Sequence, residues 1–341
     1  MPTQRQRFER LLATHEPRVR NAFLEAVAEL RDKIVIRDIA EALERGDVNG
    51  AIEAMRIEPA AFRALERSIE AAYDAGGSDA AAMISNLREP GGRRLVIRFD
   101  VRNPRAEQWL RNESSGLVSG IVGDQRAAIR AGLETGLREG RNPRSVALDI
   151  VGRVQRGSNR RSGGIIGLTS QQESAVARAR DDLLSGDPSR MKSYLNRQRR
   201  DRRFDRTVAK AIREGRALDR VTVNRIAGRY GDRLLQLRGE AIARSEMLSA
   251  LQASKLEAFR QAVDSGQVSR ETIKRTWRTA GDGRVRDTHN GMNGQTVLGL
   301  DAPFISPSGV RLMHPGDGPA EESINCRCNQ EIRIDFLAGV E

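Results

Sequence analysis

The segment EESINCRC, residues 321–328, followed by EIRID, residues 331–335, decides how the C-terminal part of the chain is interpreted. It contains the two cysteines of the chain, Cys326 and Cys328. In residues 331–335 apolar and polar residues alternate, which predicts a strand, and Asn325 is typical of a turn. We therefore expect a turn that carries both cysteines and leads into a strand.

Two of the three histidines of the chain, His289 and His314, fall in the same C-terminal part. Two thiols and two imidazoles are the right number and kind of ligands for a closed tetrahedral zinc site. The spacing is not that of a zinc finger, so the prediction depends on the concentration of the four residues in one segment. The alternatives are buried cysteines without a metal and a Cys326–Cys328 disulfide, which would be strained and out of place in a reducing cytoplasm.

The composition changes after residue 265, where glycine, proline, asparagine and aspartate become frequent and the long helical patterns stop. Short runs at 295–298 and 331–335 predict strands. A segment of this size has too few large apolar residues for a core that gives more than a few kcal/mol. We therefore expect residues 265–341 to form a small α+β domain pinned by its Cys and His residues or by docking to a neighbour.

The chain before residue 265 is expected to be mainly α-helical. Apolar residues recur at three- and four-residue spacing from Phe8 to Leu30, the mark of an amphipathic helix. Further helices are expected at 59–75 (ending at AGGS, 75–78), 105–139, 142–154 and 169–263, with a β-like run, LVIRFDV, at 95–101. With 38% hydrophobic and only 4% aromatic residues, an elongated helical body is favoured over one large core. The expected domains are an N-terminal helical region (1–95), a central helical body (96–264) and the C-terminal domain (265–341).

The chain carries 58 basic and 46 acidic side chains, a net charge of +12, which favours polyanionic partners. Two segments are candidates for contact with nucleic acid, a glycine-rich loop at 156–164 and the charged run RQRRDRRFDR at 197–206. The alternatives are a plain exposed loop for the first, and for the second a solvated helix face in which Asp201 and Asp205 offset part of the charge. The candidate arginines are Arg156, Arg160, Arg161, Arg197, Arg199, Arg200, Arg202 and Arg203.

Several classes of protein are not favoured by the sequence. No run of about 18 apolar residues predicts a membrane span, and residues 1–19 lack the apolar stretch of a signal peptide. No nucleophile elbow or phosphate-binding loop is found. A metal-dependent nuclease that uses His289 is the enzymatic alternative. A closed Cys/His site would leave no open coordination position for such chemistry, so we expect a binding protein rather than an enzyme, with no small-molecule substrate.

Five segments in order suggest a family. TWRTAGDGRVRDTH (276–289), GMNGQTV (291–297), PF (303–304), HPGD (314–317) and EESINCRC (321–328) closely resemble the signature of the phage Mu F-like head morphogenesis proteins. EAIARSEM (240–247) is similar to the helix that leads into this domain. The specific resemblance spans about residues 240–330.

The resemblance implies a minor head protein, made in the host cytoplasm and carried in the virion at the portal vertex and the capsid interior. Its expected partners are the portal protein, the major capsid protein and packaged DNA, with roles in head assembly and DNA packaging or ejection. A non-portal DNA-binding or scaffolding protein is a further alternative. Some family members have an aromatic residue at the position of His314, which leaves His289, Cys326 and Cys328 as the better metal ligands.

Four more residues of this segment are expected to have structural or interface roles. Arg284 and Arg286 are expected to pair with Glu321 and Glu322 or with a carboxylate of the portal. Asp282 and Asn325 are expected to form turns.

Overall fold

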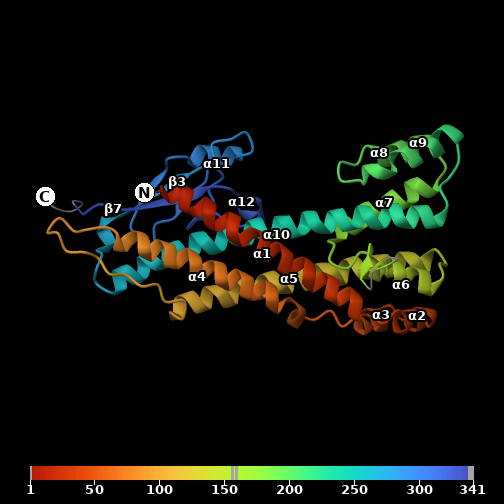
Figure 1. Ribbon diagram of the computed structural model, residues 1–341, viewed down its shortest axis with the longest axis horizontal. Coiled ribbons are helices and arrows are strands. Elements are labelled where there is room, and N and C mark those ends of the chain that lie inside the picture. Colours follow the sequence, from red (N-terminus) through yellow and green to blue (C-terminus); the bar gives the residue numbers. More distant parts are fainter. Residues whose placement is uncertain (1, 155–156, 158–159, 337–341) are drawn as a thin grey trace. The chain divides into compact units, whose positions relative to one another are not determined.

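The computed structural model describes residues 2–154, 157 and 160–336. The described chain is mainly α-helical, with a small strand-containing region near its C-terminal end (Figure 1). The expected fold class, a helical protein with a small C-terminal α+β region, is confirmed in these terms. None of the described helices has both the length and the hydropathy of a membrane span.

The chain folds into two compact units, and neither is one continuous segment. Unit 1 comprises Met1–Ala22, Leu65–Ser115 and Glu240–Glu341, and unit 2 comprises Phe23–Ala64 and Gly116–Gly239. The division into three domains at residues 95 and 264, expected from the sequence, stays a prediction.

Unit 1 holds the first part of α1 (Gln4–Lys33), most of α4 (Arg63–Ser85), the start of α5 (Pro104–Arg138) and the end of α10 (Arg220–Asp264). Its C-terminal segment contains η3 (Arg270–Thr272), β3 (Ile273–Arg278), α11 (Asp287–Met292), β4 (Thr296–Leu298), β5 (Phe304–Ile305), β6 (Arg311–Leu312), α12 (Ala320–Ser323) and β7 (Asn329–Ile334).

Unit 2 holds the remaining parts of α1, α5 and α10 together with short elements. These are α2 (Ile36–Glu44), α3 (Val48–Ala54), η1 (Pro59–Phe62), α6 (Pro143–Val151), β1 (Arg153–Val154), β2 (Arg161–Ser162), α7 (Ser170–Leu184), α8 (Pro188–Leu195), η2 (Arg202–Phe204) and α9 (Asp205–Glu214).

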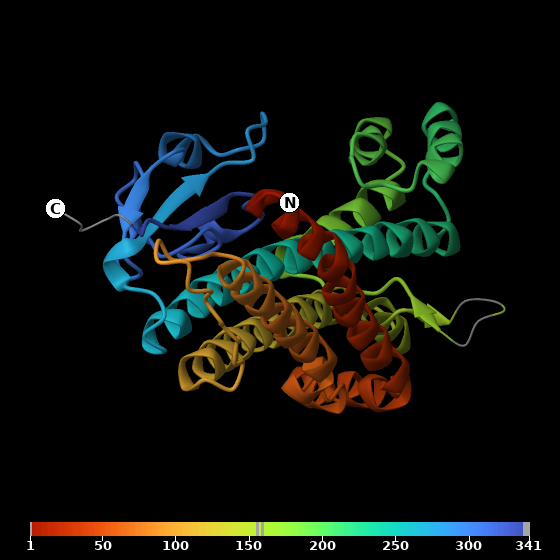
Figure 2. The same cartoon turned by 60° about the vertical axis from the view of Figure 1, so that its left-hand side comes forward.

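A three-stranded antiparallel sheet with the order β4-β3-β7 organises the C-terminal segment of unit 1. Figure 2 shows β3 and β7 as neighbouring arrows, and their register pairs Trp277 with Gln330 and Arg278 with Asn329. The strands expected at 295–298 and 331–335 correspond to β4 and β7. The buried side of β3 carries Ile273, Arg275 and Trp277, as the two-residue period of a strand requires.

Side chains, rather than a further strand, satisfy the outer edge of β7. The amide of Gln4, at the start of α1, accepts from the N–H of Ile332 at 3.1 Å and donates to its carbonyl at 2.7 Å. Lys255 donates to the carbonyl of Gln330 at 2.7 Å, and the N–H of Gln330 donates to Gln252. Because an exposed edge strand invites pairing with other chains, these contacts protect the sheet and fasten it to α1 and α10.

One apolar core fixes the sheet on the helices of unit 1. Ile273 and Ile332 of the sheet are buried with Ile84 of α4 and with Leu256 and Phe259 of α10. Full burial of a side chain of this kind stabilises by roughly 1.5–3 kcal/mol. The sheet is therefore held independently of the cysteines and histidines.

The expected end of a helix at residues 75–78 is wrong, because α4 continues to Ser85. Gly76 and Gly77 are buried within this helix. A Cβ atom at Gly76 would lie 2.4 Å from Oγ of Ser254, and one at Gly77 would lie 2.3 Å from the ring of Phe99. The two glycines permit close packing inside unit 1 instead of ending the helix.

The β-like run at 95–101 forms no ladder with another strand. Leu95 and Ile97 are buried in the core. The backbone N–H and carbonyl of Val96 bond the side chain of Gln267, each at 2.7 Å. A side-chain amide thus takes the place that a partner strand would occupy.

Candidate functional site

His289 is placed by α11 and by the central strand of the sheet. α11 begins after Arg286, whose backbone is extended, and includes His289 in its six residues. The imidazole packs edge-on against the buried ring of Trp277, with the ring centres 5.3 Å apart. Trp277 packs in the same way against Phe304. His289 is thereby held in one orientation, and only 1% of its surface is exposed.

The two cysteines lie between α12 and β7. Asn325 turns the chain with a φ of 56°, a conformation that asparagine tolerates better than most residues. Its backbone N–H donates to Oγ of Ser245 on α10 at 3.0 Å. The following residues lead into β7, so Cys326 and Cys328 project to one side and Arg327 to the other. Arg327 pairs with Asp282.

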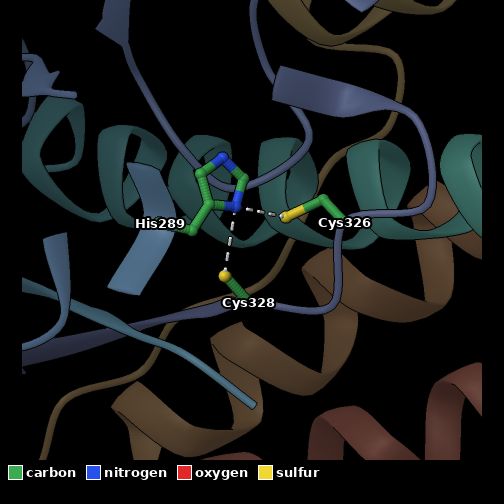
Figure 3. Close-up of side chains that lie close together, drawn as sticks. All are labelled: His289, Cys326 and Cys328. Atoms are coloured by element: carbon green, nitrogen blue, oxygen red, sulfur yellow. Dashed lines mark hydrogen bonds between the residues drawn. The ribbon is translucent and has the colours of Figure 1, made fainter. Parts of the chain in front are cut away.

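His289, Cys326 and Cys328 form one buried group (Figure 3). Nδ1 of His289 lies 3.5 Å from each sulfur atom, and the three donor atoms lie within 4.8 Å of one another. Both cysteines are free thiols, which disagrees with the disulfide alternative. The group thus directs three soft donor atoms toward a common point.

A buried carboxylate holds the other ring nitrogen of the imidazole. Nε2 of His289 lies 2.8 Å from Oε2 of Glu322, which also accepts from Oγ1 of Thr288. The second oxygen of Glu322 accepts from Oγ of Ser308 at 3.0 Å. A carboxylate in this position places the ring proton on Nε2 and leaves the lone pair of Nδ1 facing the sulfur atoms.

The electrostatics of the group favour a thiolate at Cys326. Its hydrogen bond with Cys328 and then that with His289 lower the pKa of Cys326 to about 5, against the opposing effect of burial. The hydrogen bond with Cys326 and burial raise the pKa of Cys328. Burial alone would lower the pKa of His289, but the contacts with Cys326 and Glu322 raise it. Since the thiolate is the metal-binding form of cysteine, the group is prepared to bind a cation.

The surroundings of the group fit a thiophilic cation such as zinc. The indole N–H of Trp277 is buried and has no hydrogen-bond acceptor within the described part of the chain. Two cysteine sulfurs, one imidazole and a carboxylate behind the imidazole are a donor arrangement typical of zinc.

His314 does not belong to this group. Its Nδ1 lies 3.0 Å from the carbonyl oxygen of Pro315, and burial lowers its pKa, which favours the neutral ring. The structure therefore brings together three of the four residues expected as ligands. Whether His314 contributes to metal binding stays a prediction.

The remaining residues singled out in this segment form the turns around the group. Asp282 accepts from the backbone N–H of Arg284 at 3.0 Å, as in an aspartate-containing turn. Arg286 donates to the carbonyl of Ile324 and so joins the start of α11 to the turn before Cys326. Glu322, an expected partner of the arginines, instead pairs with His289. No periodic or motif signal in the sequence points to this role of Glu322.

The charged run at 197–206 is a pinned loop rather than a helix face. Residues 197–201 are non-helical and lead into η2 and α9. Arg200 pairs with Asp205, and Arg203 with Asp201, whose side chain is 1% exposed. Asp201 also caps η2. The two acidic residues of the run therefore stabilise the loop, and their pairs with Arg200 and Arg203 are not helical i,i+4 pairs.

Arg197, another candidate of this run, is also engaged within unit 2. It pairs with Asp182 at 3.0 Å and lies over the ring of Tyr230. Arg199 and Arg202 are exposed and make no ion pair within the described residues. Of the candidate arginines of the run, these two therefore have the most accessible charge.

The glycine-rich segment at 156–164 belongs in part to a short hairpin, since β1 pairs with β2. Arg156 lies outside the described residues. Arg160 is exposed, whereas Arg161 bonds Asp32 through its backbone and the carbonyl of Gly152 through its side chain. The segment is anchored at Gly163, where a Cβ atom would lie 2.8 Å from Cα of Gly228.

The chain was compared with known families and proteins. No curated protein and no solved structure matches it significantly. A family match extends from η2 to the start of β7, and so includes α10, Trp277 and the whole His289 group. Residues 202–331 match the family model described as Phage Mu protein F like protein, and this similarity suggests a phage head morphogenesis protein.

Proposed function

We propose that this protein is a minor head protein that binds the portal protein and the major capsid protein from inside the head, at the portal vertex. Its role is in head assembly and in the packaging or ejection of DNA. The family match supports the head morphogenesis role, and it is the observation that carries the proposal. The portal, the capsid protein and DNA are our proposed partners.

We further propose that the His289 group binds zinc and that the ion has a structural role. A bound zinc ion would cross-link α11 to the turn before β7. Both ring nitrogens of His289 are engaged, one by Glu322 and one by the sulfurs, so the imidazole has no free nitrogen to activate water. This geometry supports a binding domain over the alternative of a nuclease that uses His289 as its base.

Metal content of the purified full-length chain tests this proposal. About one zinc per chain is expected by elemental mass spectrometry. Cys326→Ala is expected to lose the metal together with protease resistance within residues 265–341. His314→Ala is the matched variant, because His314 lies outside the group and its loss is expected to leave the zinc in place. A folded wild-type protein without metal would refute the zinc site.

Partner binding is tested with purified portal and major capsid proteins of the same phage. The wild-type chain is expected to co-sediment with the portal, and Cys326→Ala to do so more weakly. If the chain contains zinc but does not bind the portal, the portal role is contradicted and the zinc proposal stands. Cleavage of DNA that disappears in His289→Ala, in a variant that remains folded, would favour the nuclease instead.

DNA contact is proposed as a secondary function of the exposed arginines of unit 2. Arg199 and Arg202 have the most accessible charge of the candidate arginines in the 197–206 run. Each phosphate contact contributes about 0.9 to the slope of log affinity against log salt. Arg199→Gln with Arg202→Gln is therefore expected to reduce this slope by about two. An unchanged slope would exclude these residues from the DNA contact, and a wild-type chain without salt-dependent affinity would refute the contact altogether.

A further inference from the structure

A cavity in unit 1 reaches the metal group from one side. It has a volume of about 220 Å³ and lies between α1, the second half of α10, the loop after β3 and the turn that leads into β7. Cys326 forms part of its wall. An ion held by the group would therefore have this cavity on its Cys326 side.

Protein covers the imidazole of the group. Glu322 bonds Nε2, and Trp277 packs against the ring of His289. Both are buried. The cavity beside Cys326 is therefore where a molecule could approach the ion.

The group also supplies one donor fewer than a closed zinc site has. Among the residues that the structure describes, the cluster capable of holding a metal consists of His289, Cys326 and Cys328. A closed zinc site has four protein ligands, whereas a site with three has a fourth position that an external molecule can take. Three donors beside a cavity match the second arrangement.

The size and lining of the cavity indicate the kind of molecule. A water molecule occupies about 30 Å³ of liquid volume, so the cavity could hold a molecule several times larger. Phe8, Leu12 and Leu248 form its apolar part.

The charged side chains that line the cavity form pairs of opposite charge. Arg5 pairs with Glu9, and Arg244 lies 3.7 Å from Glu16. Arg327 pairs with Asp282. A zinc ion with two thiolates and a neutral imidazole carries no net charge either, so the cavity favours a small uncharged donor over a multiply charged ion.

We infer that an ion bound by His289, Cys326 and Cys328 would keep its fourth coordination position open to this cavity, and that the position takes a small uncharged molecule with a nitrogen donor of the imidazole class. The inference rests on the proposed metal site and adds an exchangeable ligand to it. It makes the domain a receptor for a small molecule as well as a cross-linked binding domain.

Cobalt substitution of the full-length chain tests the open position. Co²⁺ in a tetrahedral thiolate site absorbs visible light, and the bands shift when one of its ligands is exchanged. Imidazole, added to the Co²⁺-loaded protein, is expected to shift these bands with saturation while the cobalt stays bound. The measurement reports coordination and requires no enzymatic activity.

Two neighbouring residues of α1 provide a matched pair of variants. Leu12 lines the cavity, whereas Ala13 is exposed and outside its wall. Leu12→Trp is expected to fill the cavity and weaken the imidazole response at least tenfold, while Ala13→Trp responds like the wild type. Uptake of Co²⁺ by both variants shows that the site itself is intact.

The outcomes separate this inference from the metal site. Cobalt that binds with a thiolate spectrum but does not respond to imidazole overturns the open position and leaves the zinc proposal standing. A response that Leu12→Trp retains in full overturns the cavity as the route. If no cobalt or zinc binds, both the metal site and the exchangeable ligand are refuted.

Discussion

Replacement of Glu322 tests the role of the carboxylate behind the metal group. Glu322 is 5% exposed, and its Oε2 lies 2.8 Å from Nε2 of His289. In Glu322→Gln the amide oxygen can still accept from this N–H, but the charge is lost. In Glu322→Ala the N–H of His289 and the hydroxyls of Thr288 and Ser308 all lose their acceptor.

The expected effect follows from these contacts. Loss of an outer partner of a metal-bound histidine weakens metal binding about 10–100-fold, which is about 1.4–2.7 kcal/mol. Glu322→Gln is expected near the lower end, because a neutral hydrogen bond replaces a charge-assisted one of about twice the strength. Glu322→Ala is expected near the upper end, because a buried donor without an acceptor costs about 1–3 kcal/mol.

Competition with a chromogenic zinc chelator measures this affinity. Glu321→Gln is the matched control, since Glu321 is the exposed neighbour on the same short helix. Its affinity is expected to equal that of the wild type. The reasoning is refuted if Glu322→Ala binds zinc as tightly as Glu321→Gln does, because the carboxylate would then have no part in preparing the imidazole.

Three further predictions concern stability, each read from urea unfolding followed by circular dichroism. Asp149 is 9% exposed and accepts hydrogen bonds from three arginines in unit 2. Asp149→Asn is therefore expected to lower the free energy of unfolding by about 3–5 kcal/mol. A decrease below about 1 kcal/mol would contradict this network. Burial lowers the pKa of Lys255 from 10.5 to about 7. Between these pH values the unfolded lysine binds a proton that the folded one does not, so stability should rise with pH in the wild type and more weakly in Lys255→Met; equal slopes would refute the shift. Because residue 325 has a positive φ, Asn325→Ala is expected to lower the free energy of unfolding by about 1–2 kcal/mol, and Asn325→Gly by less. Equal decreases would mean that the asparagine side chain, and not the backbone conformation, stabilises the turn.

Local patterns in the sequence predicted the elements whose signals are themselves local. The strands near 295–298 and 331–335, the helix that ends before Gly140 and the one capped by Asn142 all agree with the structure. The concentration of cysteine and histidine in one segment predicted a group of four residues, and the structure brings three of them together, His289, Cys326 and Cys328. These features depend on residues that are close together in the sequence or that have the same ligand chemistry.

Features that depend on distant contacts were not predicted. Gly76 and Gly77 resemble a helix end, and only the side chains of Ser254 and Phe99 explain why they lie inside a helix. Residues 95–101 resemble a strand, but the partner of Val96 is a side chain 171 residues further along the chain. Glu322 looks like one of several acidic residues until the fold places it on His289. In each case a partner far away in the sequence overrides the local preference.

The two ways in which the C-terminal segment is held lead to a specific expectation for zinc removal. The sheet is fixed by the core with α4 and α10 and by the side chains on the edge of β7, none of which involves the metal group. The segment with α11, which carries His289, and the turn that carries Cys326 are held mainly by the contacts within the metal group. The hydrogen bonds of Arg286 and Asn325 add to these contacts. Because metal binding and local folding are coupled, a chelator should increase hydrogen exchange in residues 280–295 and 320–328 while β3 and β7 stay protected. Loss of protection in β3 at the same rate would mean that the ion, and not the apolar core, stabilises the sheet.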